Sequence, residues 1–202
     1  MEARVATLHE LRAALHTEHQ HLWQLIAAAR HAAADARRTA LQRLLRYLAV
    51  HEAAEEVSIH NVWVDDSTRE RLDEEREAAE IVERLVRAVD QADDRPDDRV
   101  ADGVDGGVDG EAGAAAPWDD EFLFTLDQLE RSLRDHADAE ENEELPILAT
   151  ELTPEHLGEM LRIVLMVREV AEDRASPVAD ASFATMRLSA QQQFKAAVSQ
   201  LR

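Results

Sequence analysis

Residues 41–55 read LQRLLRYLAVHEAAE, and the positions of the leucines in this stretch indicate the fold class. Leucines recur in it every three or four residues, and the same stripe continues through His51 and Glu55. Such spacing places side chains on one face of an α-helix. The stretch therefore predicts a helix whose buried face is apolar at first and then carries a histidine and a glutamate.

The same helical period recurs in three further segments. Apolar stripes run through about Thr7–Ala33, Ser67–Val89 and Asp119–Leu145, and the stripe quoted above belongs to a helix over about Ala36–Val64. Each stripe has the width expected of a helix with one buried face. Pro146 is expected to end the last of these helices. Because strong helix formers dominate and aromatic residues make up only 4% of the chain, we predict an all-α fold.

Other segments lie outside these four helices. The stretch Gln91–Pro117 is rich in Asp, Gly and Ala and lacks the ligand spacing of an EF-hand, so we predict a disordered acidic insert. Two more helices are expected, over about Pro154–Asp173 and Ala181–Leu201. We predict a metal-binding bundle over residues 1–150 and a helical extension over residues 151–202. The extension either covers one end of the bundle or forms a dimer surface.

The composition argues against several classes of function. A net charge of −21 argues against binding to nucleic acid or to an anionic membrane, both of which attract clustered Lys and Arg. No apolar run approaches the roughly 20 residues that span a bilayer, and the first residues lack a secretory signal. The chain has no cysteine. We therefore expect a cytoplasmic protein in which nitrogen and oxygen ligands hold any metal.

The His-x-x-x-Glu spacing of His51 and Glu55 recurs at His136 and Glu140. Residues four apart share one helix face, about 6 Å apart along the axis, so both side chains can reach one metal cluster. One such pair arises easily by chance on an acidic helix. Two pairs, each within a leucine-rich stripe, indicate a metal site, because a buried carboxylate is costly unless a cation compensates its charge.

The remaining two helices carry candidate ligands on their own stripes, His19 on the first and Glu75 on the third. Imidazole and carboxylate suit iron, manganese or zinc, and a carboxylate can bridge two ions. The predicted metal ligands are His19, His51, Glu55, Glu75, His136 and Glu140, with Glu55 and Glu140 bridging. Further candidates are His16, one turn before His19, and Glu52, which otherwise faces solvent. Glu141 is expected on a solvated face and Tyr47 in the core.

The chain resembles the hemerythrin-like family, the HHE cation-binding domain, whose ligand pattern runs H…HxxxE…H…HxxxE. Residues 18–22 (EHQHL) resemble the acid-His opening of that pattern, residues 51–56 (HEAAEE) its first signature and residues 136–148 (HADAEENEELPIL) its second. The resemblance covers roughly residues 7–160. It implies an up-down-up-down four-helix bundle that holds two non-haem iron ions with bridging carboxylates.

The chain departs from the family pattern at Glu75, which stands where the family has a histidine on the third helix. Because anionic oxygen donors stabilise ferric iron more than imidazole does, we expect a redox-active protein that reacts with oxygen, peroxide or nitric oxide. The alternative is a non-catalytic oxygen or iron sensor or carrier that signals through its C-terminal helices. The sequence names no organic substrate and leaves a homodimer open.

Overall fold

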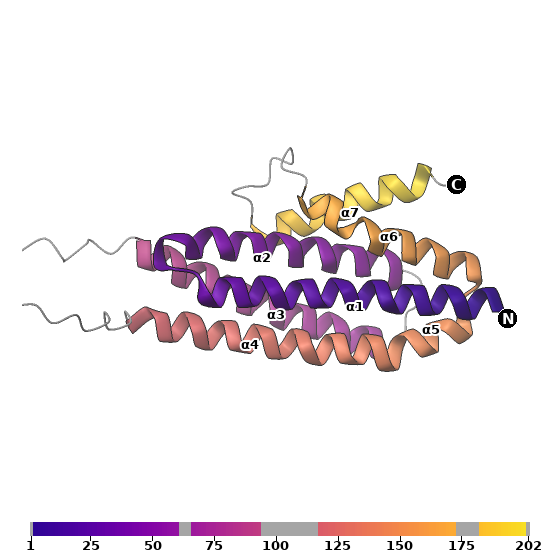
Figure 1. Ribbon diagram of the computed structural model, residues 1–202, viewed down its shortest axis with the longest axis horizontal. Helices are drawn as coiled ribbons and strands as arrows, with labels where there is room; N and C mark the ends of the chain where they lie inside the picture. Colours follow the sequence, from indigo (N-terminus) through magenta and orange to yellow (C-terminus); the bar gives the residue numbers. More distant parts are fainter. Residues whose placement is uncertain (1, 61–65, 94–116, 173–181, 201–202) are drawn as a thin grey trace, which may run out of the picture.

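The computed structural model describes residues 2–60, 66–93, 117–172 and 182–200. Every regular element in these ranges is helical, which confirms the all-α prediction. Four long helices lie side by side along the long axis of the molecule (Figure 1). They are α1 (Glu2–His31), α2 (Ala34–Glu55), α3 (Asp66–Asp93) and α4 (Pro117–Ala139). Most of the predicted acidic insert, residues 94–116, lies outside the described residues.

The apolar stripes of these helices face one another and form the main core. Leucine and isoleucine side chains from all four helices are almost completely buried there, among them Leu22, Ile26, Leu48, Leu85 and Leu129. Burying one such side chain contributes roughly 1.5–3 kcal/mol, so the stripes fix the rotation of each helix about its axis. The histidines and glutamates that continue the stripes are thereby carried into the interior.

Two short π-helical segments interrupt the regular α-helices. The segment η1 (Glu56–His60) follows Glu55 directly, and the segment η2 (Glu140–Glu144) begins at Glu140. A π-helical turn accommodates an extra residue and is common at functional sites. Both His-x-x-x-Glu pairs therefore end where the helix widens, a feature that a 3.6-residue period does not predict.

The prediction that Pro146 ends the fourth helix is wrong. The chain continues from η2 into α5 (Leu145–Glu151), and Pro146 lies in the first turn of that helix. Proline is common in the first turn of a helix because its fixed φ already suits the helical conformation. The helical path therefore continues beyond the proline, and Leu145 and Leu148 are buried by it.

The C-terminal helices α6 (Pro154–Glu172) and α7 (Phe183–Gln200) pack against the bundle. The predicted cap is present, since Thr153 Oγ1 accepts a hydrogen bond from the backbone N–H of His156 at 3.3 Å. At one end of the molecule, α1, α5 and α6 form a second apolar cluster that includes Leu11, Leu148 and Leu157. Side chains of α6 and α7, such as Phe194, also join the main core. The extension therefore packs along α1 and α2, and a dimer surface on it stays a prediction. No helix in the described part of the chain is both long and apolar enough to cross a membrane.

Candidate metal centre

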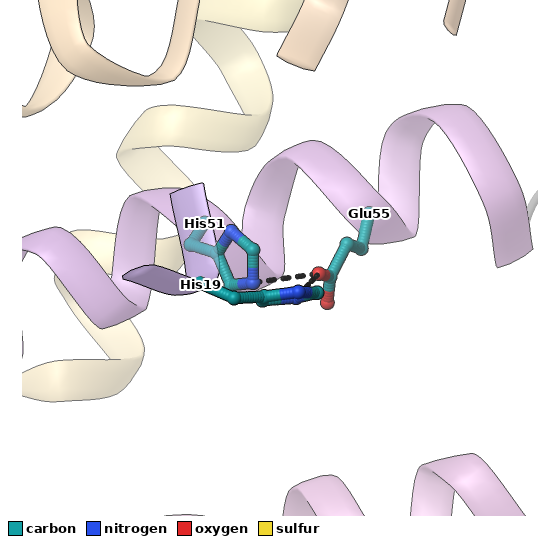
Figure 2. Close-up of side chains that lie close together, drawn as sticks. All are labelled: His19, His51 and Glu55. Atoms are coloured by element: carbon teal, nitrogen blue, oxygen red, sulfur yellow. Dashed lines mark ion pairs between the residues drawn. The ribbon is translucent and has the colours of Figure 1, made fainter. Parts of the chain in front are cut away.

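Five of the six predicted ligands come together inside the bundle. They come from three helices and from η2, and are His19 (α1), His51 and Glu55 (α2), His136 (α4) and Glu140 (η2). Figure 2 shows His19, His51 and Glu55 pointing toward one another. The sixth, Glu75, belongs to α3, but its side chain lies outside the described residues.

The first group of ligand atoms comprises His19, His51 and Glu55, all at least 97% buried. His51 Nε2 lies 2.7 Å from Glu55 Oε1, and His19 Nε2 lies 4.0 Å from the same oxygen (Figure 2). The two imidazole rings meet edge to face, with centroids 5.1 Å apart. Their nitrogens and the carboxylate oxygen thus surround one small volume.

The second group comprises Glu55, His136 and Glu140. His136 Nε2 lies 3.4 Å from Glu55 Oε2, while Glu140 Oε2 lies 3.3 Å from His19 Nε2. Within each group the ligand atoms all lie within 4.8 Å of one another. Glu55 belongs to both groups and presents one oxygen to His51 and the other to His136. A carboxylate in this position can bridge two ions.

Three buried atoms of the centre indicate that these residues fit a metal ion. His19 Nε2, Glu55 Oε1 and Glu140 Oε2 make no hydrogen bond of acceptable geometry within the described part of the chain. These atoms approach one another or His51 Nε2 at 2.7–4.0 Å without hydrogen-bonding geometry, and a buried polar atom that makes no hydrogen bond costs free energy. All three atoms belong to the two ligand groups, so a cation placed among them would satisfy them together. The donor set of imidazole and carboxylate therefore fits a metal ion such as iron, manganese or zinc.

The charges in the centre shift the pKa values of its members. Burial lowers the pKa of His19, but Glu140, Glu55 and Glu141 outweigh that effect and raise it from 6.5 to about 9. Burial likewise raises the pKa of Glu55, but His51 and His136 hold it well below its usual range. In the absence of a cation, the protonated imidazole of His19 compensates part of the negative charge.

Glu141 does not lie on a solvated face, so the expectation from the sequence is wrong for this residue. Its Oε1 lies 2.7 Å from His19 Nδ1, and its other oxygen lies 3.1 Å from the Nδ1 of His16, whose side chain is 58% exposed. The contact with Glu141 directs the other ring nitrogen of His19, Nε2, toward the centre. His16 therefore contacts Glu141 and is not part of either ligand group. Regular α-helical spacing could not reveal this arrangement, because η2 begins at Glu140.

Glu52, the other additional candidate, is buried and does not face solvent. It lines a small cavity together with His51, Glu55 and His136, and it forms an ion pair with Arg187 of α7 at 3.6 Å. The volume of this cavity is about 20 Å³, room for about one water-sized molecule. Its remaining walls are mostly apolar and comprise Leu48, Ala78, Ser132 and Leu133.

Tyr47 is buried in the core, as expected, but its hydroxyl also makes a polar contact. Its hydroxyl donates a hydrogen bond to Glu18, the residue before His19. Burial and the negative charge of Glu18 both raise the pKa of Tyr47, so the phenol stays neutral. Arg168 of α6 completes this cluster, with its Nε 3.4 Å from Glu18 Oε1.

The comparisons with known proteins bear on this geometry. The family model described as the hemerythrin HHE cation binding domain matches residues 10–148. No curated protein and no solved structure gave a significant match. The matched range contains His19, both His-x-x-x-Glu pairs and the Leu-Pro sequence that follows the second pair. The chain therefore belongs to the hemerythrin HHE cation-binding domain family.

Proposed function

We propose that this chain holds two non-haem iron ions and binds or reacts with a small ligand: oxygen, hydrogen peroxide or nitric oxide. The observation that supports this proposal most directly is the position of Glu55, which belongs to two ligand groups at once. One position would use His19 and His51, and the other His136 and Glu140, with Glu55 between them. Manganese or zinc would suit the same donors, but the family match favours iron.

The protein's own residues would prepare the centre for iron and its ligand. Glu55 and Glu140 supply negative charge in a buried space, and Glu141 orients the imidazole of His19. His19 must release a proton before Nε2 can coordinate, so metal binding would be linked to proton release. Bound iron would supply the redox and ligand-binding chemistry that these side chains lack.

The cavity beside the centre supports a small ligand. Its volume of about 20 Å³ and its walls of Leu48, Ala78 and Leu133 suit a diatomic molecule or peroxide and leave little space for an organic substrate. Because Glu75 would add a third carboxylate in place of the family's histidine on the third helix, we propose a centre that favours the ferric state. These features together favour a redox-active protein over a reversible oxygen carrier.

A second function, a non-catalytic oxygen or iron sensor, is supported by a different observation. The helices α6 and α7 pack directly on α1 and α2, which carry three of the ligands. A change at the centre could therefore alter the packing of these helices. Peroxide consumption by the purified iron-loaded protein separates the two functions, because a sensor would consume it no faster than free iron does.

Metal analysis and an optical spectrum after loading with ferrous iron under anaerobic conditions test the proposed centre. We expect about two iron ions per chain and, after exposure to air, ferric absorption bands. Iron content should fall sharply in His51→Ala and Glu140→Ala, whereas His156→Ala, at an exposed position of α6, should keep it. Wild-type iron content in both ligand variants would contradict the proposal.

A further inference from the structure

The C-terminal helices place two arginines on buried glutamates that adjoin the candidate ligands. Arg168 of α6 pairs with Glu18, the residue before His19, and Arg187 of α7 pairs with Glu52, the residue after His51. Both glutamates are buried, at 6% and 5% exposure. A buried carboxylate needs a nearby cation, and the extension supplies one to each.

The two pairs differ in their relation to the centre. The carboxylate of Glu18 also accepts the hydrogen bond from Tyr47, and Glu18 is not among the residues that line the cavity beside the ligands. Glu52 lines that cavity together with Glu55 and His136. Glu52 therefore contacts Arg187 and also lines the cavity beside the candidate ligands.

The contact between α7 and the ligand-bearing helix extends over two turns. One turn after Arg187, Gln191 donates a hydrogen bond from Nε2 to Glu56, the first residue of η1. The two contacts fall at positions 52 and 56 of the ligand-bearing segment and at positions 187 and 191 of α7. This matched spacing sets the register of α7 beside the ligands His51 and Glu55.

We propose that Arg187 is a positioning residue that competes with the metal for the carboxylate of Glu52. While the ion pair is formed, Glu52 is held toward α7 and the centre keeps the ligands described above. When Arg187 withdraws, the carboxylate of Glu52 turns to the metal and joins the centre as an additional ligand. This inference rests on the proposed metal site, and it makes α7 a part of the molecule whose position sets the donor set.

The competition links the docking of α7 to the metal. Any event that draws Glu52 to the metal weakens the contact with Arg187, and any event that detaches α7 strengthens metal binding by the same free energy. The coupling operates through one carboxylate and requires no change elsewhere in the bundle. Through this coupling, the docking of residues 182–200 on the bundle would depend on metal binding.

Thermal unfolding with and without ferrous iron, under anaerobic conditions, tests the competition in the full-length chain. Arg187→Met should increase the iron-induced rise in Tm by about 2–4 °C beyond that of the wild type, because iron then compensates Glu52. Arg168→Met is the matched control: it breaks the other arginine–glutamate pair, and should lower Tm equally with and without iron. The double variant Arg187→Met/Glu52→Gln should return the iron-induced rise to the wild-type value.

The ferric absorption spectrum provides a second readout. It should change in Arg187→Met, where a carboxylate joins the centre, and return to the wild-type form in the double variant. Equal iron-induced rises in Tm for the wild type, Arg187→Met and Arg168→Met would overturn the inference. So would an Arg187→Met chain that stays unfolded with iron present while the double variant folds, because the metal would then fail to compensate Glu52. A wild type that binds no iron would instead refute the proposed function itself.

Discussion

His136 Nε2 lies 3.4 Å from Glu55 Oε2, although the two residues come from α4 and α2 and are 81 positions apart in the chain. The other oxygen of the same carboxylate lies 2.7 Å from His51 Nε2. Glu55 thus connects the two ligand groups, and the integrity of the centre depends on how α2 and α4 pack. The leucine stripes that fix this packing are therefore as necessary to the site as the candidate ligands themselves.

The raised pKa of His19 predicts how the stability of the metal-free protein depends on pH. Because this pKa is about 9 in the folded protein and 6.5 for an ordinary histidine of an unfolded chain, its stabilising contribution is fully present below pH 6.5 and is lost as the pH rises toward 9. The upper limit of that contribution is about 3 kcal/mol. Urea unfolding of the metal-free protein between pH 6.5 and 9 should show this decrease, and His19→Gln should lack it. A wild type and a His19→Gln variant with the same pH dependence would refute the prediction.

The contact between Glu141 and His19 predicts a loss of metal affinity when the carboxylate is removed. Glu141→Ala should weaken iron binding by roughly 10- to 100-fold, since partners that orient a ligand imidazole have effects of this size. Glu143→Ala is the matched control, because it removes an equal charge from an exposed position two residues later in the same segment. Titration with ferrous iron measures both. Equal losses would mean that the charge of Glu141, and not its contact with His19, is responsible.

The sequence predicted those parts of the centre that follow a regular period. His51 with Glu55 and His136 with Glu140 stood out because each pair continues a leucine stripe at helical spacing, and the structure brings both pairs together. Glu141 did not stand out, because the helix changes to a π-helical segment at Glu140 and the residues beyond it leave the α-helical register.

The contacts that the C-terminal helices make could not be predicted from the sequence either. Arg168 and Arg187 lie on helices whose packing partners no local pattern specifies, and their carboxylates, Glu18 and Glu52, are distant in the chain. In the sequence alone, a glutamate beside a histidine cannot be distinguished from a solvent-exposed glutamate, because the helix that packs against it is not known. Glu52 therefore had two interpretations in the sequence, and its solvent-facing one is wrong.

The position of Glu75 in the third helix predicts that it is a metal ligand. In the sequence, Glu75 continues the apolar stripe of the third helix and stands where the family pattern has a histidine. Glu75→Gln should weaken one metal position while the bundle stays folded, and Glu75→His should favour the ferrous state and more persistent oxygen binding. Glu77→Gln, at an exposed position of α3, is the control. Unchanged iron content and redox behaviour in both Glu75 variants would show that this residue is not a ligand.

The cavity beside the centre predicts that ligand binding can be blocked without loss of iron. Ala78→Val adds volume to a wall of a space of only about 20 Å³, at a cost in stability of roughly 1–3 kcal/mol. The iron content should remain that of the wild type, while the affinity for nitric oxide, followed by absorption, should fall. Undiminished nitric oxide binding would place the ligand site elsewhere.

Iron content per folded chain in Glu55→Gln and His136→Ala tests the shared role of Glu55 most directly. The wild type should hold about two ions, His136→Ala about one, and Glu55→Gln markedly fewer than His136→Ala, because only Glu55 belongs to both ligand groups. Circular dichroism confirms that each variant is folded before its iron is measured. A Glu55→Gln variant that keeps as much iron as the wild type, or that loses no more than His136→Ala, would contradict a centre built around this carboxylate.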